Sequence, residues 1–311
     1  MENQNDFWLP SQSFLTIEGQ IVRNPNDSTI AFCPNGLLQL FSECKYLLNG
    51  VEIDHTRGLG LATTLKGYCN LTPDEMLSYH HAGWGEFPDT LTTGVEHRFK
   101  ACIPLKFLLG FAEDYTKILL GCRQELILTR AGHDKNALWK TLPTRTEGVT
   151  EANYKTTIAN YKAAELGTVT ISKMTWNLAS IAVADKARIT LLQIINNDIP
   201  ITIGFRSWQY FEHPSVPSTK EFKWTITSAT QLERPRFIIV AFQTDRKDNV
   251  LAQANHFDHV NVTDVKVFLN SDSFPYSNLT LDFKRNKYGP AYQMFHNFQS
   301  TYYNETHRVP A

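Results

Sequence analysis

One stretch of this sequence, residues 99–130, holds its densest apolar material and is interrupted by a single acidic pair, Glu113-Asp114. In the second half of the stretch, the residues that share one side at a period of two include Leu120, Cys122, Leu126 and Leu128. Such a period is typical of a strand with one buried face and not of a helix. The pattern predicts two strands, 101–111 and 117–130, with the acidic pair at the turn between them. We therefore expect the chain to be organised around a buried sheet.

Length and composition favour a β-rich chain of two domains. The chain has 311 residues, and a prior of roughly 150 residues per domain gives two domains. Its 19 Phe, 12 Tyr and 6 Trp suit pleated, half-buried surfaces. The 30 Lys and Arg nearly balance the 31 Asp and Glu, which argues against a protein that wraps nucleic acid, because phosphate neutralisation needs clustered cations. A weak local contact with nucleic acid stays open.

The cysteines and the apolar runs indicate the kind of cellular compartment in which the chain is expected. Five cysteines leave one unpaired in any disulfide scheme and form no C-x-x-C motif, so we expect reduced, buried thiols. The start of the chain lacks the layout of a signal peptide, and no run approaches the roughly 20 apolar residues of a membrane-spanning helix. The sequence therefore predicts no membrane partner and no secretion by a classical signal.

Short segments bounded by turn residues recur along both halves. Asn49-Gly50 between two apolar runs predicts a hairpin. Helices are expected over 72–81, where Thr-Pro-Asp-Glu forms a capping box, over 151–167, and from Gly289 onward. Strands are expected over 14–22, 29–32, 37–48, 168–183, 189–195, 199–210, 222–229, 235–242 and 262–269. Strands at this spacing, with few helices between them, indicate antiparallel sandwiches or barrels.

No established catalytic or nucleotide-binding motif occurs in the sequence. Gly58 and Gly60 lack the third glycine of a dinucleotide fingerprint and fit a plain loop better. Two histidine groups could form zinc sites: His80, His81 and His97, and separately His256 and His259. Neither group has a cysteine pair or an acidic residue at a recognised ligand spacing, so solvated loop histidines are the favoured interpretation.

Two further segments have a chemical and a structural interpretation. Glu113-Asp114 could serve acid–base chemistry, but neighbouring side chains on an extended chain point to opposite faces, so a turn is favoured. Residues 205–211 interleave aromatic and basic side chains and could stack on bases or sugars. Alternation places Arg206, Trp208 and Tyr210 on one face, and a sandwich core with a paired arginine is favoured. We predict no catalytic, cofactor-binding or metal-binding residue, no cofactor, and no enzymatic activity.

Several segments, taken together, give the chain a family resemblance: 9–19, 45–53, 103–115, 231–243 and 268–275. In these it resembles the double jelly-roll major capsid proteins of Polinton/Maverick elements, adintoviruses and their endogenous relatives. The resemblance spans nearly the whole chain and carries no catalytic residue. It implies an all-β fold of two jelly rolls, which are antiparallel β-sandwiches, side by side with a few short helices. It also implies that three copies form a pseudo-hexagonal capsomer in a shell.

Combined with the shift in composition after residue 130, the resemblance gives a domain plan of a first jelly roll over 1–132, a linker with a helix over 133–167, and a second jelly roll over 168–311. Relatives continue with further strands, whereas this chain stops at Ala311. If those strands are missing, the second roll has an open sheet edge, which favours aggregation or pairing with a partner.

Two functions follow from the resemblance. The first is a structural capsid subunit, a self-assembling homotrimer whose partners are copies of itself and other capsid proteins, located in the virion. The alternative is a host-retained, capsid-derived protein that acts as a binding module without forming shells, located in the cytoplasm or nucleus. The oligomeric state separates the two.

Overall fold

The largest sheet is built on β1 (Phe7–Val22), which pairs with β10 on one side and with β6 on the other. The computed structural model describes residues 7–22, 30–84, 92–93, 97–140, 150–163, 167–226 and 235–304. All pairings are antiparallel, in the order β10 (Thr168–Ile181), β1, β6 (Arg98–Pro104) and β5 (Thr92–Thr93), with β7 (Leu119–Leu120) also on β1. Along β1, Leu15, Ile17 and Ile21 are buried at alternate positions and face one side.

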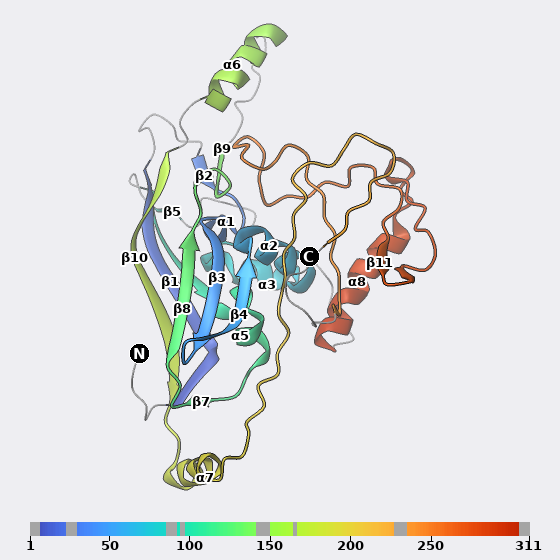
Figure 1. The fold of residues 1–311 in the computed structure, drawn as a ribbon. Coiled ribbons are helices and arrows are strands. Elements are labelled where there is room, and N and C mark those ends of the chain that lie inside the picture. Colours follow the sequence, from blue (N-terminus) through green and yellow to red (C-terminus); the bar gives the residue numbers. More distant parts are fainter. Residues whose placement is uncertain are drawn as a thin grey trace.

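A second sheet, in the order β4 (Val51–Arg57), β3 (Phe41–Leu48) and β8 (Gln124–Arg130), faces the first (Figure 1). The ring of Tyr46 in β3 lies 6.2 Å from that of Trp176 in β10. Two short antiparallel pairs complete the sheets: β2 (Ile30–Phe32) with β9 (Leu138–Lys140), and β11 (Val267–Leu269) with β12 (Asp272–Phe274). Antiparallel strands in several sheets, with short helices, confirm the all-β prediction.

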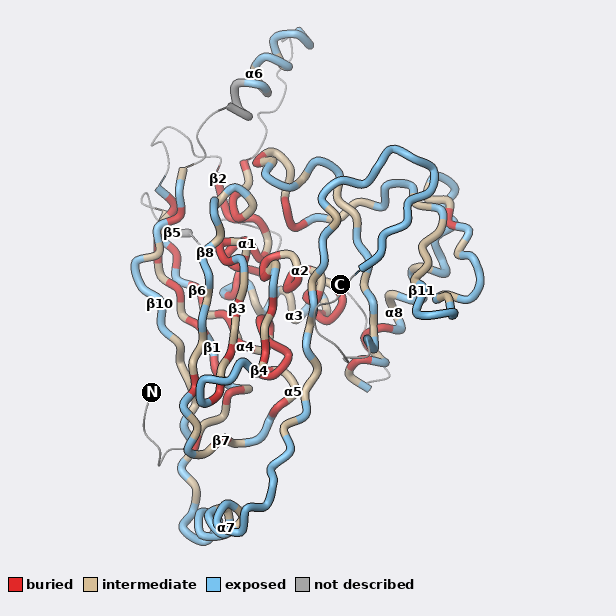
Figure 2. Tube along the Cα trace, viewed as in Figure 1, coloured by how far each residue is buried: buried red, intermediate tan, exposed pale blue. Residues whose placement is uncertain are grey.

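The main core fills the space between the two sheets and the helices beside them. Figure 2 shows the buried residues concentrated there, whereas the second half of the chain is largely exposed. The helices that pack on this core are α1 (Gly36–Gln39), α2 (Leu59–Asn70), α4 (Leu105–Leu108) and α5 (Gly110–Asp114). Tyr46 stacks on Phe111 of α5 at 4.8 Å, so helix and sheet share one core.

Several local predictions are confirmed. Asn49 and Gly50, with φ of 51° and 79°, form the turn between β3 and β4. Thr72 and Glu75 form the capping box of α3 (Pro73–Ser78), which is followed by the 3-10 turn η1 (His80–Ala82). The other two expected helices are α6 (Glu151–Ala163) and α8 (Gly289–Tyr303). Each of these signals is local, which is why the sequence alone located them.

The prediction of two long strands over 101–111 and 117–130 is wrong in part. Only 98–104 and 124–130 form long strands, and they lie in different sheets, while α4 and α5 occupy 105–114. The apolar character of 105–114 does not distinguish a strand from a helix, because a short continuous apolar run fits a buried strand or a buried helix equally well. The predicted strand 37–48 is likewise α1 followed by β3.

Two helices contradict the sequence prediction. Residues 189–195, expected as a strand, lie within the helix α7 (Asp185–Asn196). Gly58 and Gly60, expected in a plain loop, lie at the start of α2, where Gly58 is the N-cap residue with φ of 54°. Because α2 has neither a polar N-cap side chain nor an acidic first turn, it lacks the usual start signal.

The second half of the chain contains few regular elements. Residues 199–226 and 235–266 contain no strand, although strands were expected over 199–210, 222–229 and 235–242; of these, 227–229 lie outside the described residues. The strand expected over 262–269 is limited to β11 (Val267–Leu269). A strand requires a ladder of backbone hydrogen bonds to a neighbouring strand, and no such ladder forms along these segments in the described part of the chain. The later elements are β11, β12, η3 (Phe283–Arg285) and α8.

The predicted domain boundaries at 132 and 167 stay a prediction. β10, which begins at Thr168, pairs with β1 in the first sheet, so this sheet includes residues from both sides of the predicted linker. Within the linker, residues 141–149 and 164–166 lie outside the described ones. In the described ranges, no helix is long and apolar enough to cross a membrane.

Candidate functional site

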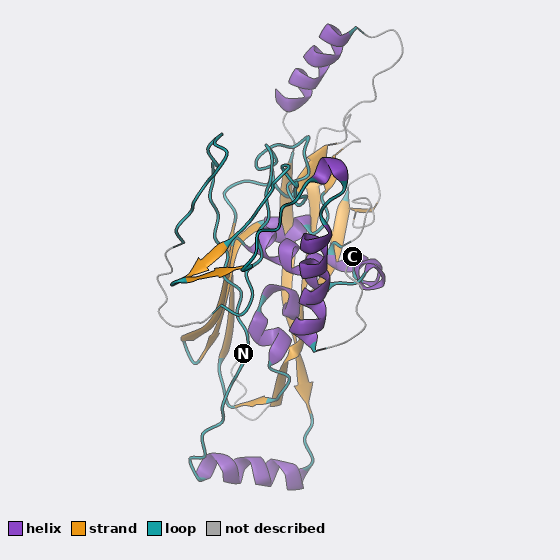
Figure 3. Ribbon diagram, turned by 90° about the vertical axis from the view of Figure 1, so that its right-hand side faces the viewer, coloured by secondary structure: helices purple, strands orange, loops and turns teal. Residues whose placement is uncertain are grey.

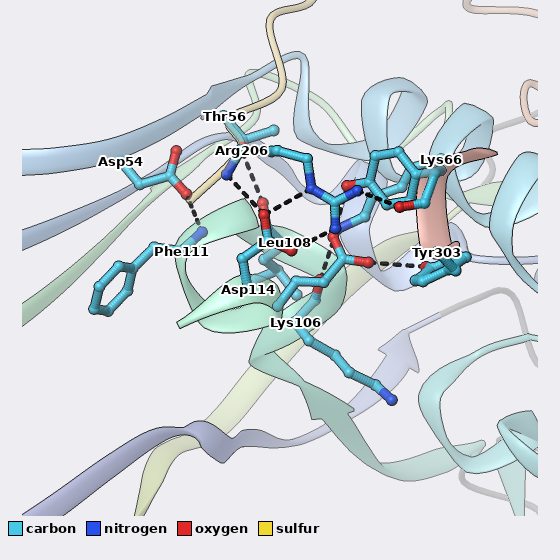
Figure 4. A network of polar contacts seen from close by, with 11 residues as sticks. Asp54, Thr56, Lys66, Lys106, Leu108, Phe111, Asp114, Arg206 and Tyr303 are labelled. Carbon is cyan, nitrogen blue, oxygen red and sulfur yellow. Dashed lines mark hydrogen bonds and ion pairs between the residues drawn. The ribbon is translucent and has the colours of Figure 1, made fainter. Parts of the chain in front are cut away.

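The two halves of the chain meet at a group of charged and aromatic side chains, shown in Figure 4. We call it the junction cluster, and it comprises Lys66 of α2, Glu113 and Asp114 of α5, Arg206, and Tyr302 and Tyr303 of α8. Helix α5 ends at Asp114, which places two adjacent carboxylates where the second half of the chain passes. The acidic pair was predicted as a turn between strands; it instead joins separate parts of the fold.

Arg206 binds Asp114 through both its side chain and its backbone. The guanidinium Nε and Nη2 donate to the two carboxylate oxygens at 2.8 and 2.5 Å, and the backbone N–H of Arg206 donates at 2.7 Å. Burial raises the pKa of Asp114, but the hydrogen bonds from Arg206 outweigh burial and hold this pKa below its usual value. The hydrogen bond to Asp114 raises the pKa of Arg206. Both groups are therefore charged over the physiological range.

The same guanidinium also holds α8. Its Nη1 donates to the backbone carbonyl of Tyr302 at 2.7 Å, and its central carbon lies 3.6 Å from the centre of the Tyr302 ring. An arginine can satisfy a carboxylate, a carbonyl and an aromatic face together because its donors are spread over a rigid plane. Arg206 thus links α5 to α8.

Glu113 is the more deeply buried member of the acidic pair. Lys66 Nζ lies 2.7 Å from its Oε2, and the two side chains are 6% and 11% exposed. Lys66 also donates to the carbonyl of Lys106 at 2.7 Å, while the hydroxyls of Tyr302 and Tyr303 donate to Glu113 at 3.1 and 2.8 Å. A buried charge pair satisfied in this way is strongly destabilised when one partner is removed.

The helical corner that carries the acidic pair is fixed to β4. The buried carboxylate of Asp54 accepts the backbone N–H groups of Phe111 and His55, both at 2.8 Å. Thr56 Oγ1 donates to the carbonyl of Leu108 at 2.7 Å. Burial raises the pKa of Asp54, which is the opposite direction to the shift at Asp114. These hydrogen bonds lie entirely within the first half of the chain, so the position of α5 is fixed without contacts from the second half.

The segment around Arg206 packs tightly on α5. A side chain at Gly110 would collide with the backbone carbonyl of Arg206, so only glycine allows this approach. The ring of Phe205 meets Phe111 edge-on at 5.4 Å. Trp208, predicted as core, is half-buried, with Tyr302 at 5.7 Å and Lys66 Nζ at 5.6 Å from its ring. The prediction of a paired Arg206 is confirmed.

A second contact joins the halves near β2 and β9. Asn255 is fully buried, donates to the carbonyl of Pro34 and accepts from Gln39 Nε2. Asn136 and Asp248 exchange two hydrogen bonds, from the Asp248 backbone N–H at 2.7 Å and from Asn136 Nδ2 at 3.2 Å. This contact therefore holds the second half to the first in addition to the junction cluster.

An open hollow of about 530 Å³ lies between α2 and the second half of the chain. Its lining includes Tyr68, Cys69, Arg246, His256 and Phe295. Arg246 binds Asp258 through Nε and Nη2 at 2.7 and 2.6 Å, and this lowers the pKa of Asp258 to about 2. Burial and the nearby Arg246 lower the pKa of His256. The hollow is thus mainly apolar, with one arginine already paired.

The histidines that could serve as zinc ligands are distributed over separate elements. His80 and His81 are neighbours in η1 with ring centres 5.7 Å apart, and the ring of His259 stacks on Phe283 at 4.5 Å. Across the described ranges, no group of three or more His, Cys, Asp or Glu side chains is placed to hold a metal ion. All five cysteines are free, with Cys33, Cys44 and Cys69 buried.

The junction cluster has a structural role, because its polar contacts join separate elements of the fold. Both oxygens of Glu113 and both oxygens of Asp114 accept hydrogen bonds or ion pairs, so neither carboxylate is left open to a substrate. Sequence analysis singled out Glu113, Asp114 and Arg206 but did not bring them together. It missed Lys66 and Tyr303, because their pairing is across 47 and 190 residues, which no local pattern reports.

Comparison with known proteins gives one match. The sequence profile of the family described as double jelly roll-like domain matches residues 30–310, which is most of the chain and includes both halves of the junction cluster. No curated protein and no solved structure matches. The match confirms the resemblance to double jelly-roll proteins of the capsid type. The chain belongs to the double jelly roll-like domain family.

Proposed function

We propose that this chain is a structural subunit of a capsid-type shell, that it self-associates into trimeric, pseudo-hexagonal capsomers, and that it has no catalytic role. The observation that carries the proposal is the family match over residues 30–310. The junction cluster supports it, because its ion pairs and hydrogen bonds hold two parts of one building block together and occupy the carboxylates of both Glu113 and Asp114.

The exposed apolar side chains of the second half also support self-association. They occur at alternate positions of the extended segments, with Phe222, Trp224 and Ile226 39–48% exposed, and Ile238 and Val240 45% and 49% exposed. Large exposed apolar patches on a folded protein mark interaction sites or aggregation hazards. For a shell subunit, other copies and other capsid proteins would cover such patches, and the virion would be its location.

The oligomeric state tests this proposal. We expect size-exclusion chromatography with light scattering to give a species of about three times the 35.5 kDa chain mass, and negative-stain microscopy to show capsomers or particles. A stable monomer at high concentration, with no trimer and no particle, would contradict the capsid function.

The open hollow supports a second candidate function, a capsid-derived binding module that no longer builds shells. Its volume of about 530 Å³ lies in the size range of small-molecule sites, and its lining is mainly apolar. A monomer that binds an apolar fluorescent probe, and loses that binding when Phe295 is replaced by Asp, would favour this alternative. Probe binding unaffected by Phe295→Asp would argue against it.

A further inference from the structure

Helix α7 (Asp185–Asn196) stands apart from the rest of the molecule. Figure 1 shows it at the lower end, carried on two extended arms, and Figure 3 shows its axis running across the end of the sandwich. None of its residues is buried. A helix of 12 residues is marginal in water without packing of its apolar face, so α7 requires a partner.

The exposed apolar residues of α7 form a stripe that is symmetric about its middle residue, beside the half-buried Leu191 and Ile194. Ile189, Leu192 and Ile195 are 57%, 43% and 44% exposed and follow one another at a spacing of three. Leu192 is the middle residue of the three. In an antiparallel pair of α7 helices centred on Leu192, the two copies of Leu192 face each other, and Ile189 of each copy lies level with Ile195 of the other.

The charges of α7 favour this antiparallel arrangement. Lys186 and Arg188 outnumber Asp185 in the first turns, and Asp198 follows the last turn, outside the helix. Lys186 precedes Leu192 by six residues, and Asp198 follows it by six. None of these four charges forms an ion pair with another described residue. Antiparallel pairing brings the basic end of one helix, which is also the positive end of its dipole, to the acidic end of the other.

We propose that α7 is a contact between two copies of this chain, in which the helices pair antiparallel across a two-fold axis at Leu192. This inference rests on the proposed function, since it names a surface through which subunits or capsomers would touch. Each copy contributes only a three-turn helix, far less than the roughly 800 Å² per partner of a stable interface. The contact would therefore be weak alone and would gain strength from the multiple copies in an assembly.

A membrane surface fits α7 less well. Helices that lie in a bilayer interface carry a strongly basic polar face with Trp, Phe or Leu opposite. In α7 and the residue that closes it, Asp185 and Asp198 balance Lys186 and Arg188, and the helix contains no aromatic residue. The experiments below include vesicles of phosphatidylcholine and phosphatidylserine, because binding to such vesicles is the result that would favour a membrane contact.

Cysteine cross-linking on the full chain tests the geometry. Leu192→Cys should form a disulfide-linked dimer on mild oxidation, faster by on the order of tenfold than Ile189→Cys, whose two copies would lie about 9 Å apart along the axis. Thr190→Cys, on the opposite side of the helix, and the wild type are the controls for background from the natural cysteines. Equal cross-linking at positions 189 and 192 would indicate a parallel bundle and overturn the proposal.

A charge exchange provides a second test on the Leu192→Cys background. Lys186→Glu should slow cross-linking several-fold, and adding Asp198→Lys should restore it, because only antiparallel pairing brings the first turn of one helix to the Asp198 end of the other. No restoration would overturn the charge argument. Vesicle binding by the wild type that Leu192→Asp abolishes, without cross-linking, would replace the proposal with a membrane contact.

The outcome also separates this inference from the proposed function. Trimers or particles without cross-linking at position 192 would overturn the α7 contact and leave the capsid function standing. Cross-linked dimers without trimers or particles would support the contact and contradict the capsid function. A monomer that neither assembles nor cross-links would overturn both.

Discussion

The guanidinium of Arg206 donates to both carboxylate oxygens of Asp114, and the backbone N–H of Arg206 donates to the same carboxylate. The two residues are 92 positions apart in the sequence and lie in different halves of the chain. Through Tyr302 the arginine also reaches α8. One side chain therefore connects α5 in the first half of this protein to the 205–208 segment and α8 in the second.

Arg206→Met should lower the free energy of unfolding by roughly 2–4 kcal/mol, because Asp114 is then left partly buried without its partner. Urea denaturation followed by fluorescence measures this, and a double-mutant cycle with Asp114→Asn gives the coupling energy. The matched control is Arg246→Met, which removes a similar two-point ion pair whose partner, Asp258, lies in the same half. Limited proteolysis should release the second half in the first variant and not in the control; additive effects at Arg206 and Asp114 would contradict this account.

Gly110→Ala should destabilise the junction even though alanine is the better helix former. Its methyl group would meet the backbone carbonyl of Arg206, so the 205–208 segment must move away from α5. We expect a fall in melting temperature and a weaker Arg206–Asp114 coupling. Gly132→Ala, where a methyl group meets nothing within 4 Å, is the control and should change stability by less than about 0.5 kcal/mol. Equal melting temperatures for the two variants would argue against the close approach.

Trp208→Ala should cost roughly 2–3 kcal/mol, less than a fully buried tryptophan, because Trp208 is only half-buried. The loss arises from its contacts with the Tyr302 ring and with the Lys66 ammonium group. Thermal unfolding by circular dichroism measures it. Trp224→Ala, at a side chain that is 39% exposed and lies in an unpaired segment, is the comparison and should have a smaller effect. An unchanged melting temperature for Trp208→Ala would place this residue at the surface and favour a binding role for 205–211.

The contribution of Asp114 to stability should depend on pH. Its pKa in the folded state is below the ordinary value of 3.8, so its stabilisation is fully present above 3.8 and is lost as the pH falls through the folded-state pKa. The difference in unfolding free energy between the wild type and Asp114→Asn should therefore be constant near neutral pH and shrink below about pH 4. Denaturant titrations over a pH series measure this. A difference that grew on acidification would contradict the ion pair.

Thiol reagents should distinguish two classes of cysteine in the folded protein. Cys33, Cys44 and Cys69 are buried, and burial raises the pKa of Cys33 and of Cys69 to about 12 and also raises that of Cys44. Because the thiolate is the reactive form, these three should react only after unfolding. Cys102 and Cys122 are half-buried and should react first. Titration with a chromogenic disulfide should give two fast thiols, and Cys102→Ser or Cys122→Ser should each remove one.

Sequence alone determined the elements whose signals are local. The turn Asn49-Gly50, the capping box of α3, and the helices α6 and α8 depend on residues a few positions apart, and all lie where the pattern placed them. The sheet-based fold class also followed from composition, short strand spacing and turn residues, and the family match agrees. The sequence also predicted that Arg206 has a polar partner, because the alternation of residues 205–211 favours a partly buried segment.

Tertiary structure decided whatever depends on which surface a segment meets. The apolar run over 105–114 could be buried as strand or helix, and it became α4 and α5 because Asp54 and Thr56 of β4 satisfy the backbone of that corner. Segments over 199–210 and 235–242 have strand-like side chains, yet a strand also needs a ladder of backbone hydrogen bonds to a neighbouring strand, and none of the paired strands in the described part of the chain lies in these segments. The junction cluster joins residues up to 190 positions apart, and such contacts are fixed by the geometry of the fold and not by any pattern along the chain.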